Sequence, residues 1–527
     1  MPPFHDKGEG RRAGSPLWEL FRRGCAAQPG ELLVDGRLRL SGPAALSLAG
    51  GMAAAMGGWN AGGRNARRIG FLCRPGAAHA AAWFAVHALG AVPVNLHVRE
   101  SARRLADTLD CVGLDWLVCD RDLAEQATAV VRDAAHAAGI ATLAADGALD
   151  ILAPPRAGGP GAPSFARESW EGRVAGIIMS SGSTGQPKAI CHDAQSLLWS
   201  AAAGSVVYGR LSPADATLVC MGTSFAAWTN VVVPFLAAGA KLCFDAGFDP
   251  ATFLHKLAAE RITVAPLVPS MWNMVLQAAS APPDLGALRV AMTSGEPVRA
   301  SLAERLRERI CPTIHAGYLS SEGLCGTAIV ADERDLILPG APGCIGRPIP
   351  FTEAKIAVAG DDGGERDAAP GETGELLLRG PSMALGYLGQ PELSAERFAG
   401  GWWRTGDLAS TDGEGRFFSR GRTDNLINSG GIKVHAEEVE AALMAHPAVL
   451  SAAVVGLPDP AWGQRIEAFV VLRPGQPESV DFAAFLEQQD LLPRLKRPKA
   501  VHLRAALPVG PTGKLYRKAL LEEAARA

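Results

Sequence analysis

The sequence lacks an excess of charge of either sign. Its 527 residues include 51 Lys and Arg against 54 Asp and Glu, which gives a net charge of about −3. Proteins that bind nucleic acid carry a marked basic surface, so the composition gives no support for a nucleic-acid partner. Glycine (60) and proline (37) are plentiful but follow no fixed period, so collagen-like and solenoid folds are excluded.

The sequence also has no cysteines spaced C-x-x-C, no apolar signal-peptide core within residues 1–12 and no long apolar run. None of its ten cysteines forms a C-x-x-C pair, and ten thiols in a chain this long do not make a disulfide scaffold. They are expected to be reduced and mostly buried, which favours a cytoplasmic protein. The segment 1–12 is polar. The most membrane-like segment, 76–96, contains two histidines and a proline, so a buried helix leading into a strand is expected and stable membrane insertion is not.

Short apolar runs alternate with Ala/Leu-rich helical stretches. An apolar fraction of 48% is enough for a sizeable core. The expected strands are Arg68–Cys73, Ala91–Asn95, Trp116–Cys119 and Val174–Met179, and the expected helices include Ala77–Leu89 and Leu123–Ala138. Strands that alternate with helices predict an α/β body with a mostly parallel sheet.

The last hundred residues carry a different pattern. A Gly/Pro-rich stretch at 154–163 indicates a linker or surface loop, and the Gly/Asp-rich stretch 359–374 indicates a hairpin. Beyond Asp424, helices are expected over Glu437–Ala445 and Phe482–Leu491, with strands over Ser451–Val455 and Glu467–Leu472. We therefore expect an N-terminal domain at 1–423, with several subdomains of sheets flanked by helices, and a small α+β domain at 424–527.

A loop rich in Gly, Ser and Thr follows one of the expected strands. It reads Ser180-Ser181-Gly182-Ser183-Thr184-Gly185-Gln186-Pro187-Lys188. Glycines let backbone N–H groups point inward, hydroxyls donate to phosphate oxygens, and the lysine neutralises charge. The loop is not a Walker loop, because the Gly-Lys-Ser/Thr ending is missing. Taken alone, it fits a phosphate-binding loop or a plain Ser/Gly loop.

Further motifs follow in a fixed order. They are Tyr318-Leu319-Ser320-Ser321-Glu322, Trp403-Arg404-Thr405-Gly406-Asp407, Gly421-Arg422-Thr423-Asp424, Ser429-Gly430-Gly431 and Pro511-Thr512-Gly513-Lys514. Together with the loop, this set resembles the acyl-adenylate-forming superfamily, which includes acyl-coenzyme A synthetases, adenylation domains and beetle luciferases. The resemblance extends from about Ala91 to Lys518.

The resemblance implies a two-step reaction and its small-molecule partners. A carboxylic acid attacks the α-phosphate of ATP to form an acyl-adenylate, and the thiol of coenzyme A then displaces AMP. The first step brings two anions together, so the site must supply positive charge and hydrogen-bond donors. The implied cofactors are ATP, Mg²⁺ and coenzyme A.

The resemblance also assigns residues to the nucleotide. Lys514 would be the catalytic lysine that reaches the carboxylate and the α-phosphate. Glu322 would bind Mg²⁺, which prefers carboxylate, phosphate and water oxygens. The residues expected at phosphates, adenine and ribose are Ser181, Ser183, Thr184, Lys188, Ser294, Gly295, Glu296, Pro297, His315, Tyr318, Ser321, Asp407 and Arg422.

Three further features concern motion, the thiol and regulation. Asp424 matches the hinge about which the C-terminal domain of the superfamily turns between the two steps, so this domain is expected to be mobile. Gly430 and Gly431 would line the path of the thiol, although a plain turn also explains them. The context of Lys514 resembles that of bacterial ligases acetylated on the catalytic lysine, which adds a protein acetylase as a partner; acetylation would remove the charge.

The acyl pocket is expected around Phe225, Trp228 and Gly317. Superfamily members that activate amino acids keep an Asp one residue after this Phe, where this chain has Ala226. A buried ammonium without a partner is costly, so an acid with an uncharged body is expected. Aromatic, medium-chain and small acids all remain open.

The superfamily pattern Tyr-Gly-x-Thr-Glu is altered here. Ser321 replaces Thr and keeps the hydroxyl, whereas Leu319 replaces a glycine that allows close backbone approach. This change bears on the fit near adenine or the acyl group.

The alternatives to a coenzyme A ligase are an enzyme that loads a carrier-protein thiol and a non-catalytic nucleotide-binding relative. Nothing in the sequence points to a luciferase-like oxygenase.

Overall fold

The structure is a computed structural model. It describes residues 15–61, 64–65, 67–136, 138–155, 173–181, 187–278, 282–338, 343–360, 364–476, 479–488, 492–508 and 515–524. Within these ranges no helix is long and apolar enough to cross a membrane. All ten cysteines are described, all are free, and nine of them are buried.

An eight-stranded sheet forms the first subdomain. Its strands, in spatial order, are β22 (Gly386–Tyr387), β11 (Pro187–Asp193), β10 (Val174–Ser181), β6 (Val92–Asn95), β5 (Arg68–Leu72), β7 (Trp116–Asp120), β8 (Gly139–Leu143) and β9 (Leu149–Ala153). Strands β6, β5, β7 and β8 are parallel, as the alternating pattern predicts. The segment 76–96 is confirmed as a buried helix, α3 (Ala77–Ala88), followed by β6.

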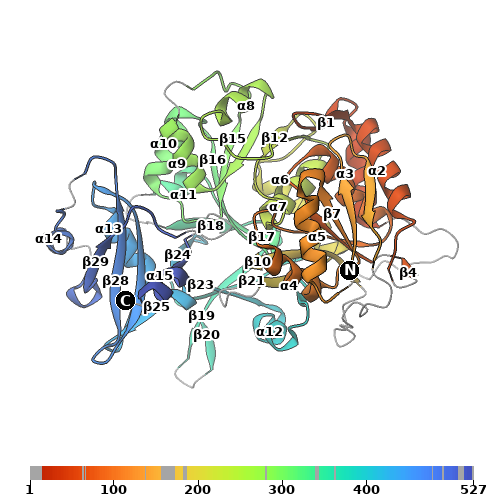
Figure 1. The fold of residues 1–527 in the computed structure, drawn as a ribbon. Coiled ribbons are helices and arrows are strands. Elements are labelled where there is room, and N and C mark those ends of the chain that lie inside the picture. Colours follow the sequence, from red (N-terminus) through yellow and green to blue (C-terminus); the bar gives the residue numbers. More distant parts are fainter. Residues whose placement is uncertain are drawn as a thin grey trace.

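A larger sheet of fourteen strands runs through the rest of the N-terminal body. Its order is β2 (Arg39–Ser41), β1 (Glu31–Val34), β13 (Lys241–Phe244), β12 (Ala216–Val219), β14 (Val264–Leu267), β15 (Val290–Ser294), β16 (Ile314–Ser320), β17 (Leu324–Ala331), β18 (Cys344–Pro348), β24 (Phe417–Arg422), β23 (Trp403–Thr411), β21 (Gly374–Arg379), β19 (Glu353–Ala359) and β20 (Glu365–Asp367). Strands β13 to β16 are parallel and the strands from β17 onward are antiparallel. The predicted hairpin at 359–374 is confirmed as the β19–β20 pair, which projects from the body in Figure 1.

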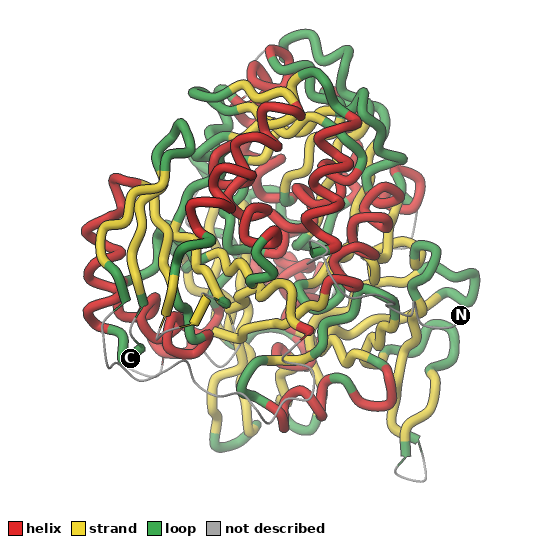
Figure 2. The backbone as a smooth tube through the Cα atoms, turned by 90° about the vertical axis from the view of Figure 1, so that its right-hand side faces the viewer, coloured by secondary structure: helices red, strands yellow, loops and turns green. Residues whose placement is uncertain are grey.

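Helices cover the sheets of the N-terminal body. They are α1 (Pro16–Ala27), α2 (Gly42–Met56), α4 (Ala102–Val112), α5 (Ala124–Asp133), α6 (Ala194–Val207), α7 (Ala226–Ala237), α8 (Phe253–Ala259), α9 (Pro269–Ala278), α10 (Ala300–Arg309), α11 (Glu333–Leu336) and α12 (Pro391–Arg397). The side chain of Ser101 accepts a hydrogen bond at the start of α4, and Gly113 ends the helix at φ +67°. The red helices packed against yellow strands in Figure 2 show this layering.

Helix α5 is shorter than the sequence predicts. It ends at Asp133, whereas the apolar pattern indicates a helix to Ala138. The carboxylate of Asp110 accepts hydrogen bonds from the backbone N–H groups of Ala135 and His136, at 2.9 and 2.7 Å. These bonds satisfy the backbone outside the helix, so the chain turns early toward β8.

A separate five-stranded sheet begins two residues after the expected domain boundary. It contains β26 (Ile432–His435), β25 (Leu426–Ser429), β28 (Gly463–Leu472), β27 (Val449–Asp459) and β29 (Ala500–Leu503). It packs with α13 (Ala436–Met444), α14 (Phe482–Gln488) and α15 (Arg517–Ala524), and it forms the blue lobe of Figure 1. The expected helices and strands of this region are therefore present, with residues 489–491 outside the described range.

Candidate active site

The adenine walls expected from the sequence lie on neighbouring strands. Strands β15 and β16 are parallel, and their register places Ser294 opposite Gly317. Gly295 continues from β15 at φ +88°, a conformation that favours glycine. Because ligands of such sheets bind beyond the carboxyl ends of the strands, Ser294, Gly295 and Tyr318 lie at the edge where a ligand is expected.

Tyr318, Asp407 and Arg422 meet in one cluster. The Tyr318 hydroxyl donates a hydrogen bond to Oδ2 of Asp407, and Nη1 of Arg422 donates to Oδ1 at 2.7 Å. Antiparallel pairing of β23 with β24 places Asp407 opposite Arg422. Burial and the charge of Asp407 raise the pKa of Tyr318 well above its ordinary value, so the phenol remains a donor.

The backbone around Asp407 is fixed by its neighbours. The Asp407 N–H donates to Oγ1 of Thr405 at 2.9 Å, and the Thr405 hydroxyl donates to the carbonyl of Leu376 at 2.7 Å. Gly406 between them has φ +73°, so the Thr-Gly-Asp sequence makes a bend that no β-branched residue tolerates at its centre. This bend directs the carboxylate toward Tyr318.

Strands β10 and β11 precede and follow the expected phosphate loop along the chain. Residues 182–186 and the side chain of Ser181 lie outside the described residues, so the structure does not place Ser183 or Thr184. The two arms, β10 and β11, are antiparallel, and their register returns Lys188 to a position opposite Ser180. The Lys188 ammonium lies 5.5 Å from the ring centre of Tyr387.

The turn that carries Glu322 is held from several sides. Oε1 of Glu322 accepts a hydrogen bond from the Tyr387 hydroxyl at 3.1 Å, and its carbonyl accepts from the N–H of Ala384 at 2.7 Å. The N–H of Gly323 donates to Oγ of Ser320 at 2.9 Å. Burial raises the pKa of the Glu322 carboxyl, and the hydrogen bond from Tyr387 and the charge of Lys188 act in the opposite direction.

His192 supports the same turn and was not anticipated from the sequence. Its Nε2 lies 2.9 Å from the carbonyl oxygen of Ser321, and its Nδ1 lies 3.3 Å from Oγ of Ser196. The side chain is fully buried, and burial lowers the pKa of the imidazole to about 4. The neutral ring therefore donates from Nε2 to the backbone beside Glu322. The histidine that directly follows the apolar run Ala189–Cys191 of β11 is the signal that could have singled it out.

The donor set at this turn fits Mg²⁺ held jointly with a nucleotide. No group of three or more His, Cys, Asp or Glu within the described ranges forms a cation site by itself. Mg²⁺ is commonly bound by one or two carboxylates together with substrate phosphates and water. Glu322, beside the hairpin of the phosphate loop, supplies such a carboxylate.

Two further residues expected at the nucleotide have hydrogen-bond partners within the protein. Nδ1 of His315 lies 3.2 Å from the carbonyl oxygen of Val207 in α6, and His315 and Tyr318 sit three positions apart on β16, so they face opposite sides of it. The Glu296 carboxylate accepts hydrogen bonds from the hydroxyl and N–H of Ser270, at 2.9 and 3.1 Å. The structure thus brings together Tyr318, Asp407 and Arg422 but leaves the side chain of His315 apart from them.

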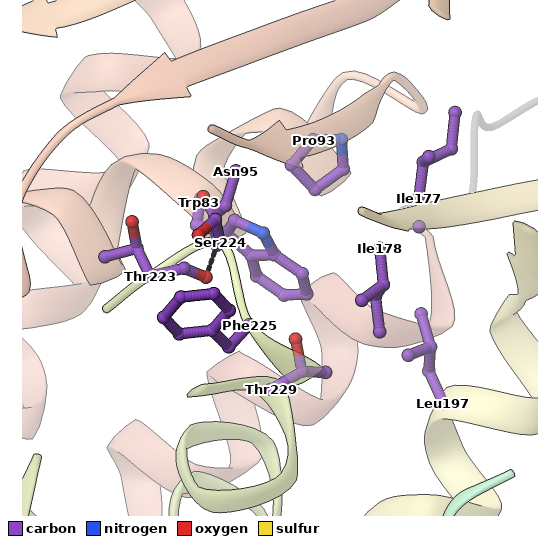
Figure 3. A pocket seen from close by; sticks show the side chains of 11 residues that line it. Trp83, Pro93, Asn95, Ile177, Ile178, Leu197, Thr223, Ser224, Phe225 and Thr229 are labelled. Atoms are coloured by element: carbon purple, nitrogen blue, oxygen red, sulfur yellow. Dashed lines mark hydrogen bonds between the residues drawn. The ribbon is translucent and has the colours of Figure 1, made fainter. Parts of the chain in front are cut away.

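The residues expected at the acyl pocket lie in different surroundings. Phe225 precedes α7 and lines a small cavity with Ser224, Thr229 and Ile178 (Figure 3). Trp228 is fully buried in the core, 5.5 Å from the ring of Trp83 and 5.1 Å from that of His79.

The third expected pocket residue, Gly317, has little room beside it. A Cβ on Gly317 would meet Cε of Met292 at 2.6 Å. A larger residue there would therefore require Met292 to move.

One wall of the cavity is fixed by a hydrogen-bonded chain. Nε2 of His79 lies 3.0 Å from Oδ1 of Asn95, and Nδ2 of Asn95 donates to the carbonyl of Thr223 at 3.0 Å. The Thr223 hydroxyl donates to the carbonyl of Cys73 at 2.9 Å. The dashed line in Figure 3 marks the contact between Asn95 and Thr223, which ties the loop before α7 to the end of β6. All eleven residues that line the cavity are uncharged.

The expected hinge lies in a short turn between the two sheets. Asp424 belongs to the 3₁₀ turn Thr423–Asn425, and its carboxylate lies 3.6 Å from Nη2 of Arg422. Gly430 and Gly431, at φ +61° and +81°, form the two-residue turn of the β25–β26 hairpin. A Cβ at Gly430 would meet the Trp462 ring at 2.5 Å, so a turn and close packing already explain that glycine.

Asp424→Pro is expected to separate the two half-reactions. Proline fixes φ and removes the N–H, so it limits rotation at the hinge. Adenylate formation should be largely retained, whereas thioester formation should slow about tenfold or more, a barrier increase of about 1.4 kcal/mol. Pyrophosphate release and thioester formation are measured separately in single-turnover reactions. Asp424→Ala, which removes the carboxylate without restricting the backbone, is the control, and equal loss of both steps in Asp424→Pro would refute the hinge.

Lys514 lies outside the described residues, but the helix that follows it is anchored. Arg517 of α15 donates to both carboxylate oxygens of Glu440 in α13, at 2.7 and 2.8 Å. Oε1 of Glu440 also accepts from the N–H of Val454 at 2.8 Å. The ion pair fixes the chain three residues after Lys514.

Glu440→Ala is expected to loosen the C-terminal domain. It leaves the Arg517 guanidinium, whose side chain is 22% exposed, with only the longer contact to Glu437 at 3.7 Å among the described residues, so the free energy of unfolding of the domain should fall by about 1–3 kcal/mol. Hydrogen–deuterium exchange of the β27 and β28 peptides should therefore accelerate. The exposed control Glu522→Ala should leave exchange unchanged, and an equal response of both variants would contradict a structural role of the pair.

Known proteins share this fold and these motifs. Residues 21–388 match the family of AMP-binding enzymes, and residues 438–514 match the C-terminal domain of AMP-binding enzymes. Feruloyl-CoA synthase from Amycolatopsis sp is 33% identical over 348 residues, which cover 65% of this chain and 68% of that protein. 2,3-Dihydroxybenzoate-AMP ligase from Bacillus subtilis (strain 168) is 31% identical over 353 residues, which cover 66% of this chain and 64% of that protein.

A solved structure shows the same architecture. The crystal structure of ATP-bound MatB from Rhodopseudomonas palustris matches 96% of this chain and 98% of that chain, with a TM-score of 0.81 and 22% identity. The fold class expected from the sequence is thereby confirmed. The chain belongs to the AMP-binding enzyme family, and its assignment to the acyl-adenylate-forming superfamily, as an AMP-forming acid–thiol ligase, is confirmed.

Proposed function

We propose that the chain uses ATP to activate a carboxylic acid with an uncharged body and transfers the acyl group to coenzyme A. The cluster of Tyr318, Asp407 and Arg422 carries this proposal. It presents a carboxylate for the ribose hydroxyls and an aromatic ring for adenine, beside the hairpin of the phosphate loop and the Glu322 turn. The family membership supports the same reaction.

In the first step, an oxygen of the substrate carboxylate forms a bond with the α-phosphorus of ATP. The bond from that phosphorus to the bridging oxygen breaks, and pyrophosphate leaves. Asp407 and Tyr318 orient the nucleoside, while Lys188 and the hydroxyls of the loop offset phosphate charge. Mg²⁺, held by Glu322, would neutralise charge on the phosphate oxygens when bound. Lys514 would stabilise the charge that develops between the acid and the α-phosphate.

In the second step, the thiolate of coenzyme A attacks the acyl carbon. The carbon–oxygen bond to AMP breaks, AMP leaves, and the thiol proton passes to solvent. We propose that rotation about Asp424 replaces Lys514 with the Gly430–Gly431 hairpin at the active site, so that residues 1–423 and 424–527 move relative to each other. The thiol would then approach past a turn that has no side chains.

The acyl group is proposed to be aromatic. The uncharged lining of the cavity beside Phe225 offers no carboxylate for an ammonium group, consistent with Ala226 in place of Asp. The names of the two relatives above refer to a feruloyl and a dihydroxybenzoate substrate. Phe225, Trp228 and Gly317 remain the proposed pocket residues, with Trp228 acting from within the core.

A panel of acids tests the proposed function. Cinnamates, benzoates, medium-chain fatty acids and acetate are supplied with ATP, and pyrophosphate release is measured with and without coenzyme A. Release that needs an aromatic acid and yields its coenzyme A thioester supports the proposal. Adenylate without a thioester favours a carrier-protein thiol as the acceptor. ATP binding without turnover of any acid favours a non-catalytic relative.

Two further expectations remain proposals. The free, mostly buried cysteines favour a cytoplasmic location. Acetylation of Lys514 by a protein acetylase would remove the charge used in the first step and so switch the enzyme off. Peptide mass spectrometry of protein from starved and fed cells detects that modification.

A further inference from the structure

Tyr387 is a buried tyrosine outside the motifs that define the family resemblance. It ends the short strand β22, where it pairs with Ile190 of β11, and it is 2% exposed. Its N–H donates to Oγ of Ser394 at 2.9 Å, and its ring lies 5.6 Å from that of Phe398. The backbone and the ring are therefore both held in place, so the hydroxyl has a defined direction.

The hydroxyl and the ring of Tyr387 reach two different parts of the active site. The hydroxyl donates to Oε1 of Glu322 at 3.1 Å. The Lys188 ammonium lies 5.5 Å from the ring centre, within the range of a cation–π contact. One side chain thus contacts both the carboxylate assigned to Mg²⁺ and the lysine at the base of the phosphate loop.

The surrounding contacts leave the Glu322 side chain dependent on this tyrosine. His192 and Ala384 hold the turn through the backbone carbonyls of Ser321 and Glu322. These bonds fix where the turn lies but not where the carboxylate points. Among the side chains that the structure describes, Tyr387 donates a hydrogen bond to the Glu322 carboxylate, and the other hydrogen bond to that carboxyl comes from the backbone of Glu322 itself.

We propose that Tyr387 is a positioning residue that aims Glu322 at the Mg²⁺ of bound Mg²⁺–ATP while its ring holds Lys188 over the same site. The inference rests on the proposed function. Groups that hydrogen-bond to a metal ligand orient it, and their loss typically lowers metal affinity or activity about 10–100-fold. Tyr387→Phe keeps the ring, the packing against Phe398 and the contact with Lys188, and it removes only the hydroxyl.

The test compares ATP binding with and without the metal. Calorimetric titration of the full chain with ATP gives one dissociation constant in excess Mg²⁺ and another in EDTA. We call the EDTA constant divided by the Mg²⁺ constant the Mg²⁺ advantage. In Tyr387→Phe this advantage should shrink about tenfold or more, with the EDTA constant unchanged. A purely structural tyrosine would instead lower the melting temperature and leave the ratio as in the wild type.

Matched variants complete the test. Tyr208→Phe, which removes the hydroxyl of a buried tyrosine at the end of α6, should keep the wild-type advantage. Glu322→Gln should lose the advantage, and adding Tyr387→Phe to it should cause no further loss, because both act through one carboxylate.

Three outcomes would overturn the inference. An unchanged Mg²⁺ advantage in Tyr387→Phe, or additive losses in the double variant, would overturn the inference about Tyr387 and leave the metal role of Glu322 standing. A Glu322→Gln variant that keeps the advantage would overturn both the inference and the metal role of Glu322. The acid panel reports on the reaction itself, so failure of the proposed function is seen there separately.

Discussion

Replacing Lys514 by alanine is expected to slow acyl-adenylate formation about 10²–10³-fold while ATP affinity changes little. The attacking carboxylate and the α-phosphate are both anions, and their approach raises the negative charge between them. A cation placed there stabilises the transition state more than the bound ground state. Its loss therefore lowers the rate rather than the affinity.

Pyrophosphate exchange into ATP measures this first step, and calorimetry measures ATP binding. Lys518→Ala is the matched control, because Lys518 lies on α15 with a side chain that is 44% exposed and 4.0 Å from Glu522. The control should retain the wild-type exchange rate. Similar rates in Lys514→Ala and wild type would remove Lys514 from the catalytic step.

Asp407→Ala is expected to weaken ATP binding at least about 100-fold, since hydrogen bonds to a charged group contribute about 1.5–3 kcal/mol each and two ribose hydroxyls lose their acceptor. The substitution also leaves Arg422 and Tyr318 without the carboxylate that holds them. Adenine contacts should weaken with the ribose contacts, because Tyr318 is no longer fixed.

The control for Asp407→Ala lies on the same hairpin. Asp412 occupies the β23–β24 turn, where it accepts hydrogen bonds from the N–H groups of Glu414 and Arg416 at 2.8 and 3.2 Å. Asp412→Ala disturbs the hairpin without touching the cluster, so it should leave the ATP dissociation constant unchanged. Equal weakening in both variants would mean that Asp407 acts through the fold of the hairpin.

The order and type of the secondary structure elements could largely be read from the sequence. The alternation of buried strands and helices predicts β5, α3, β6 and β7 within a few residues, because hydrophobic periodicity is a local property. The pairing of β18 with β24, which joins the strands up to β18 to the antiparallel strands β24, β23, β21, β19 and β20, could not be read. It depends on contacts between segments far apart in the chain.

The candidate site likewise contains residues that the sequence predicts and contacts that it does not. The ordered motifs name Tyr318, Asp407 and Arg422, and the structure brings the three side chains together. Tyr387 is 65 residues from Glu322, and His192 is 129 residues from Ser321. No spacing rule links residues so far apart, so neither contact could be predicted from the sequence.

The directions in which side chains point could not be predicted from the sequence either. Trp228 stands one helical turn after Phe225, yet it packs into the core while Phe225 lines the cavity. His315 shares a strand with Tyr318 but points to the other face. A motif places residues along the chain, whereas their orientation follows from the packing of neighbouring elements.

The stoichiometry of products tests the central claim most directly. The purified chain is supplied with ATP, Mg²⁺, coenzyme A and an aromatic acid that it turns over, and all products are quantified in one reaction. An AMP-forming acid–coenzyme A ligase must yield AMP, pyrophosphate and acyl-coenzyme A in equal amounts. Formation of ADP and phosphate in place of AMP and pyrophosphate would contradict the account.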